Sequence, residues 1–233
     1  MIAIPFQAGL GVALRVDVIS DVVCPWCYIG KRRLARALEL YREQNPRAPE
    51  PVVSWYPFQL NPDLPEGGLE RAEYLRRKFG GRADEIYARI TAVGKTVGIP
   101  FAFDNLVRQP NTLAAHSLIE LAGDAGLQDA LVEALFRAYF VEGEDLTSNQ
   151  TLERIASAAG LPPADISACL SSAEARERIR LADLRARELG VEGVPFFIIN
   201  QRYAVTGAQE PEVLLGAMLQ VEREGEESSP GAV

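Results

Sequence analysis

The sequence is poor in the residues that most often bind transition metals: it has three cysteines and one histidine in 233 residues. A structural zinc site needs four ligands, usually in two closely spaced pairs of Cys or His. This chain has one such pair, Cys24 and Cys27, whereas His116 and Cys169 stand alone in separate segments with helical patterns. Three cysteines are also too few for a secreted scaffold held together by disulfides. The sequence therefore predicts neither a metal site nor a bound cofactor.

Long apolar runs and an excess of positive charge are missing as well. No stretch approaches the ~20 apolar residues that a membrane-spanning helix needs. The formal net charge is -8 and the pI is about 4.9, which argues against electrostatic binding of nucleic acid or acidic lipid. With 48% hydrophobic residues, the chain can bury a sizeable core. We expect a soluble globular protein with neither a nucleic-acid nor a membrane partner.

The N-terminal segment "MIAIPFQAGLGVAL" is apolar enough to raise the question of an export signal. It has no Lys or Arg before Arg15, and Pro5 and Gln7 interrupt its apolar run. Cleavage after Leu14 would begin to remove the strand that leads to Cys24. We therefore expect a retained N-terminal extension, and hence a cytoplasmic protein.

Strand-like patterns occupy the two ends of the chain, and helical patterns fill the middle. The expected strands are 14–21, 51–60, 194–200 and 202–208, and 211–224 closes the chain with a helix. A turn at Asn200-Gln201 makes the last two strands a hairpin. Thr147 to Gln150 and Ser171 to Glu174 have the spacing of capping boxes, which mark helix starts. Neither half of the sheet is large enough to be stable alone, so the two halves must meet in space.

This order predicts an α/β protein whose sheet domain is split by a helical insertion. The predicted sheet domain comprises residues 1–66 and 188–233, and the inserted helical domain comprises residues 67–187. Within the first, residues 1–13 are the N-terminal extension. Residues 225–233, rich in Gly, Ser and Glu, are predicted to be a disordered tail.

The segment "DVVCPWCYIGKRRLARAL" contains a Cys-x-x-Cys pair between a strand and a helix. A structural disulfide here would close so small a loop that its entropic benefit would be slight. A redox pair is favoured, because the start of a helix stabilises a thiolate through free N–H groups and the helix dipole. We expect an exposed, attacking Cys24 and a deeper, resolving Cys27. Pro25 suits the first helical turn, and Lys31 adds a weaker positive charge two turns along.

Three other residues have more than one interpretation. Trp26 can offer an apolar platform to a substrate or simply pack. His116, on an amphipathic helix, is more often a packed residue than a catalytic base. Cys169 is interpreted as an inert residue on an apolar helix face.

Five segments resemble the DsbA-like thiol–disulfide oxidoreductases, in particular their FrnE-like cytoplasmic branch. The resemblance implies a thioredoxin-like fold, a mixed sheet flanked by helices, with a large all-helical insertion. It also implies that Cys24 attacks, that Cys27 resolves, and that Pro195 is a cis-proline beside them. The backbone of Val194 would then pair with an extended substrate. The segments are "CPWCYIGKRRL" (24–34), "YPFQLNPD" (56–63), "NTLAAHSL" (111–118), "LFRAYFVEGEDL" (135–146) and "GVPFFIIN...GAQ" (193–209).

Three classes of function fit these features. The leading one is exchange of disulfides with protein or peptide substrates, with the cellular thiol pool as electron donor. A cytoplasmic location favours reductase or isomerase work, since reduced glutathione would discharge a strong oxidant. The alternative is a glutathione-dependent small-molecule enzyme of the kappa-class transferase or 2-hydroxychromene-2-carboxylate isomerase type, although those enzymes typically have serine in place of Cys24. The third is a non-catalytic binding module, for which paired cysteines would be an oxidation hazard.

Overall fold

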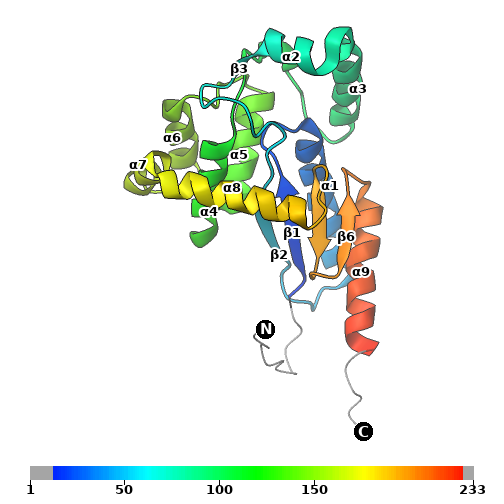
Figure 1. Cartoon of the computed structure of the whole chain (residues 1–233). Helices are drawn as coiled ribbons and strands as arrows, with labels where there is room; N and C mark the ends of the chain where they lie inside the picture. The colour runs from blue at the N-terminus through cyan, green and yellow to red at the C-terminus, as the bar shows by residue number, and fades with distance from the viewer. Residues whose placement is uncertain (1–12, 228–233) are drawn as a thin grey trace.

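The computed structural model describes residues 13–227 of the chain. They form a four-stranded sheet with helices on both faces, and a block of further helices beside and above it in Figure 1. The two ends of the chain supply the sheet, and the middle supplies the helical block. The predicted α/β fold with a large helical insertion is confirmed.

The sheet has the strand order β2–β1–β5–β6. β1 (Arg15–Ser20) and β2 (Val52–Pro57) are parallel, since helix α1 (Pro25–Gln44) connects them as a crossover. β5 (Phe196–Ile199) and β6 (Tyr203–Thr206) form an antiparallel hairpin, and β5 also pairs antiparallel with β1. The two sheet halves thus meet between β1 and β5.

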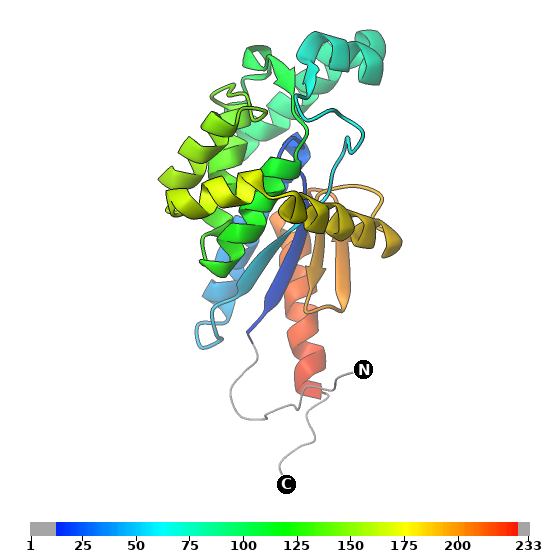
Figure 2. The same ribbon diagram turned by 60° about the vertical axis from the view of Figure 1, so that its left-hand side comes forward.

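The alternation of side chains along β1 decides which helices cover which face. Val18 is 1% exposed and lies in the main core with side chains of α1 and of α9 (Pro211–Glu227). Ile19 points to the opposite face, where it packs with Ala186 of α8 (Ala173–Glu188). Figures 1 and 2 show α8 crossing one face of the sheet, with α1 and α9 against the other.

The turn of the β5–β6 hairpin fixes where the start of β5 lies. Asn200 and Gln201 have positive φ angles of 47° and 57°, as the two central residues of a tight hairpin turn do, and the N–H of Arg202 closes the turn on the carbonyl of Ile199 at 3.0 Å. The Asn200 side chain accepts a hydrogen bond from the N–H of Arg15 at 2.7 Å, and its own N–H donates to the Arg15 carbonyl at 2.8 Å. These bonds lock the register of β5 on β1, and with it the position of Pro195 at the other end of β5.

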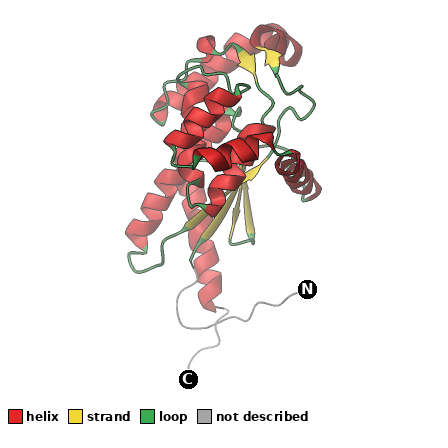
Figure 3. Ribbon diagram, turned by 90° about the vertical axis from the view of Figure 1, so that its left-hand side faces the viewer, coloured by secondary structure: helices red, strands yellow, loops and turns green. Residues whose placement is uncertain are grey.

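The helical block contains two strands that the sequence patterns did not reveal. They form a separate two-stranded antiparallel sheet, drawn in yellow among red helices in Figure 3. Strands of two residues are too short to produce a periodic pattern. In chain order the elements of the block before α8 are β3 (Leu69–Glu70), α2 (Arg71–Phe79), η1 (Gly80–Arg82), α3 (Ala83–Thr96), η2 (Phe103–Asn105), β4 (Arg108–Gln109), α4 (Leu113–Asp124), α5 (Gln128–Phe140), α6 (Asn149–Ala158) and α7 (Pro163–Ser171).

Two helices begin one residue later than the capping-box spacing predicts. The spacing pointed to Thr147 and Ser171, but Ser148 caps α6 and Ser172 caps α8. Each accepts a hydrogen bond from the backbone N–H three residues further on, at 3.3 and 3.0 Å. Two adjacent hydroxyl residues compete at both sites, and Thr147 is engaged with the Asp145 carboxylate instead.

The helical block is joined to the edge strand β2 by the side chain of Gln128. Its carbonyl oxygen accepts from the N–H of Trp55 at 2.8 Å, and its amide nitrogen donates to the Trp55 carbonyl at 3.0 Å. The amide thus satisfies edge groups of β2 as a neighbouring strand would. This pairing fixes α5 against the sheet.

The chain ends differ in part from the sequence expectations. α9 continues to Glu227, so residues 225–227 are helical rather than part of a disordered tail. Residues 1–12 and 228–233, which hold most of the predicted extension and the rest of the tail, lie outside the described residues. The domain boundaries at 66/67 and 187/188 stay a prediction. No helix within residues 13–227 combines the length and the apolar character needed to span a membrane.

Candidate active site

Cys24 is the N-cap residue of α1, at the helix start where the sequence predicted it. Its backbone is extended (φ -94°, ψ 110°), and its N–H donates to the carbonyl of Asp21 at 3.0 Å. Pro25 opens the helix, where its missing N–H removes no hydrogen bond. The Cys24 side chain makes no capping hydrogen bond, so its sulfur stays available at the positive end of the helix.

Both thiols of the pair are buried, which corrects the expectation of an exposed Cys24. Cys24 is 4% exposed, Cys27 is 1% exposed, and neither is in a disulfide. The Cys24 thiol donates a hydrogen bond to the backbone carbonyl of Val194, 3.6 Å from the sulfur. Val194 lies 170 residues further along the chain, so no local pattern could reveal this contact. Cys24 is still the more accessible of the two.

Cys27 lies in the first turn of α1 and keeps its proton. Burial raises the pKa of the Cys27 thiol well above its ordinary value, and the adjacent Cys24 sulfur, to which the Cys27 thiol donates a hydrogen bond, raises it further. Hydrogen bonds from the Ser20 side chain and the Asp21 backbone N–H lower the pKa without reversing its direction. At neutral pH Cys27 is therefore a thiol that donates to Cys24. This asymmetry supports the predicted order, in which Cys24 attacks and Cys27 resolves.

The loop beside Cys24 contains a cis peptide bond between Val194 and Pro195, as the resemblance implies. Pro195 is buried, and its carbonyl accepts a hydrogen bond from the N–H of Gly207 at 2.8 Å. Val194 is half-buried. The loop therefore lies in contact with the Cys24 sulfur, whereas its use in holding an extended substrate stays a prediction.

Gly30 allows α1 to approach this loop closely. A Cβ atom at Gly30 would lie 2.9 Å from Cγ of Pro195 and 3.2 Å from Cζ of Phe197. Contacts this short force one of the two elements to move. Sequence reasoning passed over Gly30, although a glycine inside a predicted helix is a recognised sign of close packing. Gly30 acts as a positioning residue for the loop beside Cys24.

We expect Gly30→Ala to weaken both folding and disulfide exchange. Overfilling a packed contact of this kind costs about 1–3 kcal/mol, and any shift of Pro195 moves the Val194 carbonyl away from the Cys24 sulfur. The matched control is Gly216→Ala in α9, where a Cβ would meet no atom within 4 Å. The control should be neutral or more stable by up to about 1 kcal/mol. Urea unfolding and a peptide-disulfide assay on both variants measure this, and equal behaviour of the two would contradict the role of Gly30.

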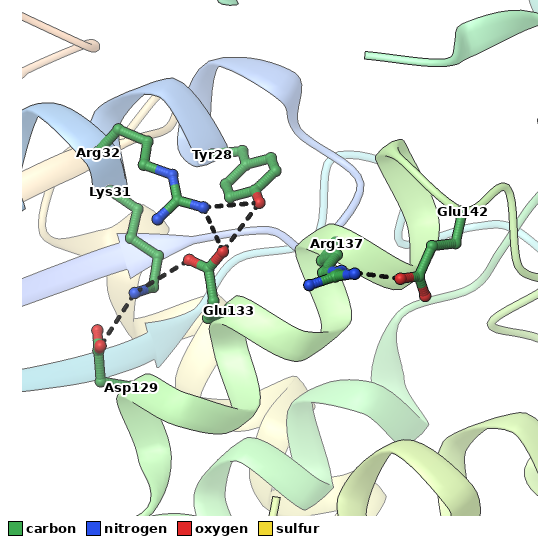
Figure 4. A network of polar contacts seen from close by, with 7 residues as sticks. All are labelled: Tyr28, Lys31, Arg32, Asp129, Glu133, Arg137 and Glu142. Atoms are coloured by element: carbon green, nitrogen blue, oxygen red, sulfur yellow. Dashed lines mark hydrogen bonds and ion pairs between the residues drawn. The ribbon is translucent and has the colours of Figure 1, made fainter. Parts of the chain in front are cut away.

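The positive charge of Lys31 is paired with carboxylates of α5. Its Nζ lies 2.9 Å from the nearer oxygen of Asp129 and 3.4 Å from Glu133. Figure 4 shows that Glu133 also accepts hydrogen bonds from Tyr28 and Arg32. Because both carboxylates offset the Lys31 charge, little of it is left to act on the thiols. The network joins α1 to the helical block, and the modulating role of Lys31 stays a prediction.

The two residues between the cysteines, Pro25 and Trp26, are both half-buried. Trp26 packs against the main core, so at least part of its ring serves packing. Its use as a platform for substrate stays a prediction.

His116 lies close to the motif through a residue that the sequence analysis missed. His116 is 3% exposed, and its Nε2 lies 3.3 Å from Oδ1 of Asp21, which is fully buried. The second carboxylate oxygen of Asp21 accepts a hydrogen bond from the N–H of Leu60 at 2.8 Å. One signal could have found Asp21: a charged residue between a buried strand and a reactive motif needs a partner.

Cys169 lies on α7, away from the pair in sequence and on a different element. It is half-buried, and burial followed by the charge of Glu120 raises the pKa of its thiol above the ordinary value. A protonated, half-buried thiol agrees with the predicted inert role. Throughout residues 13–227, no group of three or more His, Cys, Asp or Glu side chains is placed to hold a metal ion.

Comparison with known protein families and solved structures identifies the fold. The protein family described as the DSBA-like thioredoxin domain matches residues 15–219. A probable DsbA oxidoreductase of Streptomyces coelicolor superimposes with a TM-score of 0.82 and 28% sequence identity, over 94% of this chain and 93% of that chain.

Two further solved structures share the fold at lower identity. A 2-hydroxychromene-2-carboxylate isomerase gives a TM-score of 0.67 and 19% identity over 93% of this chain and 100% of its own. The cytosolic disulfide reductase DsbM of Pseudomonas aeruginosa, solved with GSH, gives 0.63 and 21% over 90% of this chain and 99% of its own. The predicted thioredoxin-like fold with its helical insertion is thereby confirmed.

Proposed function

Because the chain belongs to the DsbA-like thioredoxin family, we propose that it is a thiol–disulfide oxidoreductase acting on protein or peptide disulfides. The observation that carries the proposal is the unequal pair at the start of α1. Cys24 caps the helix without using its sulfur as a cap, and Cys27 holds a proton that it shares with Cys24 by a hydrogen bond. Such a pair has one thiol prepared to attack and a second prepared to resolve.

The exchange takes place in two steps. Cys24, as a thiolate, attacks one sulfur of the substrate disulfide, forming a mixed disulfide while the other substrate sulfur leaves as a thiolate. Cys27 then loses its proton and attacks the Cys24 sulfur. The bond from Cys24 to the substrate breaks, and its electron pair leaves with the substrate sulfur. Cys24 and Cys27 end as a disulfide, and the substrate ends as two thiols.

The direction of net transfer follows from the proposed cytoplasmic location and the FrnE-like assignment. Cytoplasmic glutathione and thioredoxin systems keep thiols reduced. The resting state of the pair is then a dithiol, which suits reduction or isomerisation. Two thiols of the cellular pool return the Cys24–Cys27 disulfide to this state after each reduction. Val194 supports the choice of protein or peptide substrates, since its backbone can pair with any extended chain.

A glutathione-dependent reaction on a small molecule is the second candidate. The fold likeness to a 2-hydroxychromene-2-carboxylate isomerase favours it. Such chemistry needs glutathione bound as a cosubstrate and has no use for a second thiol beside the first. The presence of Cys27, hydrogen bonded to Cys24, therefore favours disulfide exchange.

Insulin reduction separates the two candidates. With a thiol donor, the wild-type protein should speed the reduction of insulin disulfides, while the Cys24→Ser/Cys27→Ser double variant should leave the uncatalysed rate unchanged. Conjugation of glutathione to a small electrophile should stay at background for both proteins. Conjugation or isomerisation that survives in the double variant, without insulin reduction by the wild type, would overturn the proposal.

A further inference from the structure

A cavity in the helical block lies apart from the redox pair and takes no part in the two steps described above. Its volume is about 310 Å³, at the lower end of the range of roughly 300–1,000 Å³ that small-molecule sites occupy. Its walls come from the loop before β3, the loop between α5 and α6, and the starts of α4, α6 and α8. In Figure 1, α6 and the start of α8 lie on the side of the molecule away from α9. The lining residues do not include Cys24, Cys27, Val194 or Pro195.

Two lining side chains carry opposite charges that do not satisfy each other. Nε of Arg176 lies 4.0 Å from Oε1 of Glu66, which is too far for a hydrogen bond. The Arg176 guanidinium instead donates to the carbonyl of Leu170 at 2.7 Å. The side chain of Arg176 is 23% exposed, whereas that of Glu66 is 81% exposed. Arg176 is therefore a held cation with N–H groups to spare, and Glu66 is a carboxylate that can turn toward a ligand.

Part of the wall is apolar. Leu113 and Leu146 line the cavity and are 5% and 2% exposed, and the half-buried Ala114 follows Leu113 on α4. Burying an aliphatic group against these side chains removes apolar surface from water on both partners. The cavity thus offers one apolar contact and two opposite charges to the same ligand.

Hydrogen bonds hold the loop before β3 in place at the cavity. The Asn111 side chain donates to the carbonyl of Leu64 at 2.7 Å and accepts from the N–H of Leu113 at 3.0 Å. Nε of Arg108 donates to the carbonyl of Gly67 at 2.9 Å. These bonds fix one wall of the cavity before any ligand binds, as is usual for small-molecule sites.

The charges of the lining residues narrow the class of ligand. Glu66 repels a phosphate or any other multiply charged anion, and Arg176 repels a metal ion or a polyamine. A ligand with a single charge pairs with one of the two side chains and leaves the other unpaired. A ligand with adjacent carboxylate and ammonium groups matches both charges, and an aliphatic chain on the same ligand uses the apolar part of the wall.

We propose that this cavity binds a free α-amino acid with an aliphatic side chain. Arg176 binds the α-carboxylate and Glu66 binds the α-ammonium group, while Leu113 and Leu146 contact the side chain of the ligand. An α-amino acid carries both charged groups on one carbon, which suits two charges that lie 4.0 Å apart. The Asn149 side chain, exposed at the start of α6, lines the same cavity and is a further donor for the carboxylate. Binding is non-covalent and does not depend on the proposed function.

Isothermal titration calorimetry of the full chain with L-leucine tests the proposal. L-leucine should bind with one site per chain. L-leucinamide has no carboxylate and isocaproate has no ammonium group, so each leaves one charge of the cavity without its partner. Each analogue should bind at least about tenfold more weakly than L-leucine. Equal affinity for the three compounds, or no saturable binding of L-leucine at millimolar concentrations, would overturn the proposal.

Arg176→Gln and Glu66→Gln test the two assigned contacts. Each should weaken the binding of L-leucine by at least about tenfold, and Glu66→Gln should also abolish the preference for L-leucine over isocaproate. Because the Glu66 side chain is 81% exposed, its replacement should leave the fold intact. Glu66→Gln therefore tests the site even if Arg176→Gln fails to fold, and unchanged affinity in Glu66→Gln would contradict the assignment.

The matched control is Arg180→Gln, one turn further along α8. Arg180 pairs with Glu177 at 3.3 Å and does not line the cavity. Its replacement changes the net charge as Arg176→Gln does, but the affinity for L-leucine should match the wild type. An equal loss of affinity in Arg176→Gln and Arg180→Gln would show a general effect of charge and would overturn the site.

The Cys24→Ser/Cys27→Ser double variant separates this site from the redox pair. It should bind L-leucine with the affinity of the wild type, whether or not the wild-type protein reduces disulfides. A loss of binding in the double variant would place the amino acid at the redox pair and overturn the assignment to the cavity.

Discussion

Replacing Cys24 by serine is expected to lower the rate of insulin reduction at least about a thousandfold, because a hydroxyl cannot replace a thiolate nucleophile at neutral pH. Cys24 is the one cysteine that lies at the start of α1 and accepts a hydrogen bond from a second thiol. The substitution replaces one sulfur atom with oxygen and leaves a serine, a residue common at N-caps, as the N-cap of α1. Circular dichroism should therefore show an unchanged fold.

Cys169→Ala provides the control for Cys24→Ser. Its half-buried, protonated thiol lies on α7 and takes no part in the pair. Activity within about twofold of the wild type is expected, as for a substitution outside the reacting atoms. An insulin-reducing Cys24→Ser variant, or an inactive but folded Cys169→Ala variant, would contradict the assignment of the nucleophile.

Phe136→Ala should lower the free energy of unfolding by about 3–5 kcal/mol, the usual cost of truncating a buried phenylalanine. Phe136 is fully buried in α5, and its ring stacks on Tyr28 of α1 with the centroids 5.0 Å apart. Phe140, one turn further along α5, lies 6.2 Å from Phe136 and 6.3 Å from Tyr28. These rings are the apolar part of the contact between the active-site helix and the helical block.

Urea unfolding of Phe136→Ala, followed by circular dichroism, measures this effect. The control is Leu189→Ala, since Leu189 is 76% exposed and exposed substitutions usually change stability by less than about 0.5 kcal/mol. Alkylation of the native Phe136→Ala variant tests whether α1 depends on the helical block. The reactivity of Cys27 toward the alkylating reagent should rise as the contact between α1 and α5 weakens. A decrease in the free energy of unfolding of less than about 1 kcal/mol would be far below the usual cost at a packed core site. It would show that the aromatic contact between α1 and α5 contributes little to stability.

Local patterns in the sequence were enough to predict the frame of the fold. The strand expected over residues 14–21 is β1, and the helix expected after the Cys-x-x-Cys pair is α1, whose buried residues include Leu34, Leu38 and Tyr41. The hairpin turn at Asn200 and Gln201 was equally local. The predicted caps were displaced by one residue, since spacing alone does not separate two adjacent hydroxyl residues.

The parts of the site that sequence reasoning missed depend on contacts between distant segments. Gly30 matters because Pro195 packs on it, Asp21 because His116 lies 95 residues away, and Lys31 is paired because α5 carries two carboxylates. The burial of Cys24 has the same origin in the loop at Val194. No periodicity within a single element encodes such pairs, so each needed the assembled structure.

The most direct test of Cys24 as the attacking thiol is to trap the mixed disulfide. The Cys27→Ser variant lacks the resolving thiol, so its complex with a disulfide-bonded peptide should accumulate. Digestion and mass spectrometry are predicted to find one peptide per chain, attached to the fragment that contains Cys24. A peptide attached to Cys169 with Cys24 unmodified, or no adduct under conditions in which the wild type reduces the peptide, would contradict the assignment.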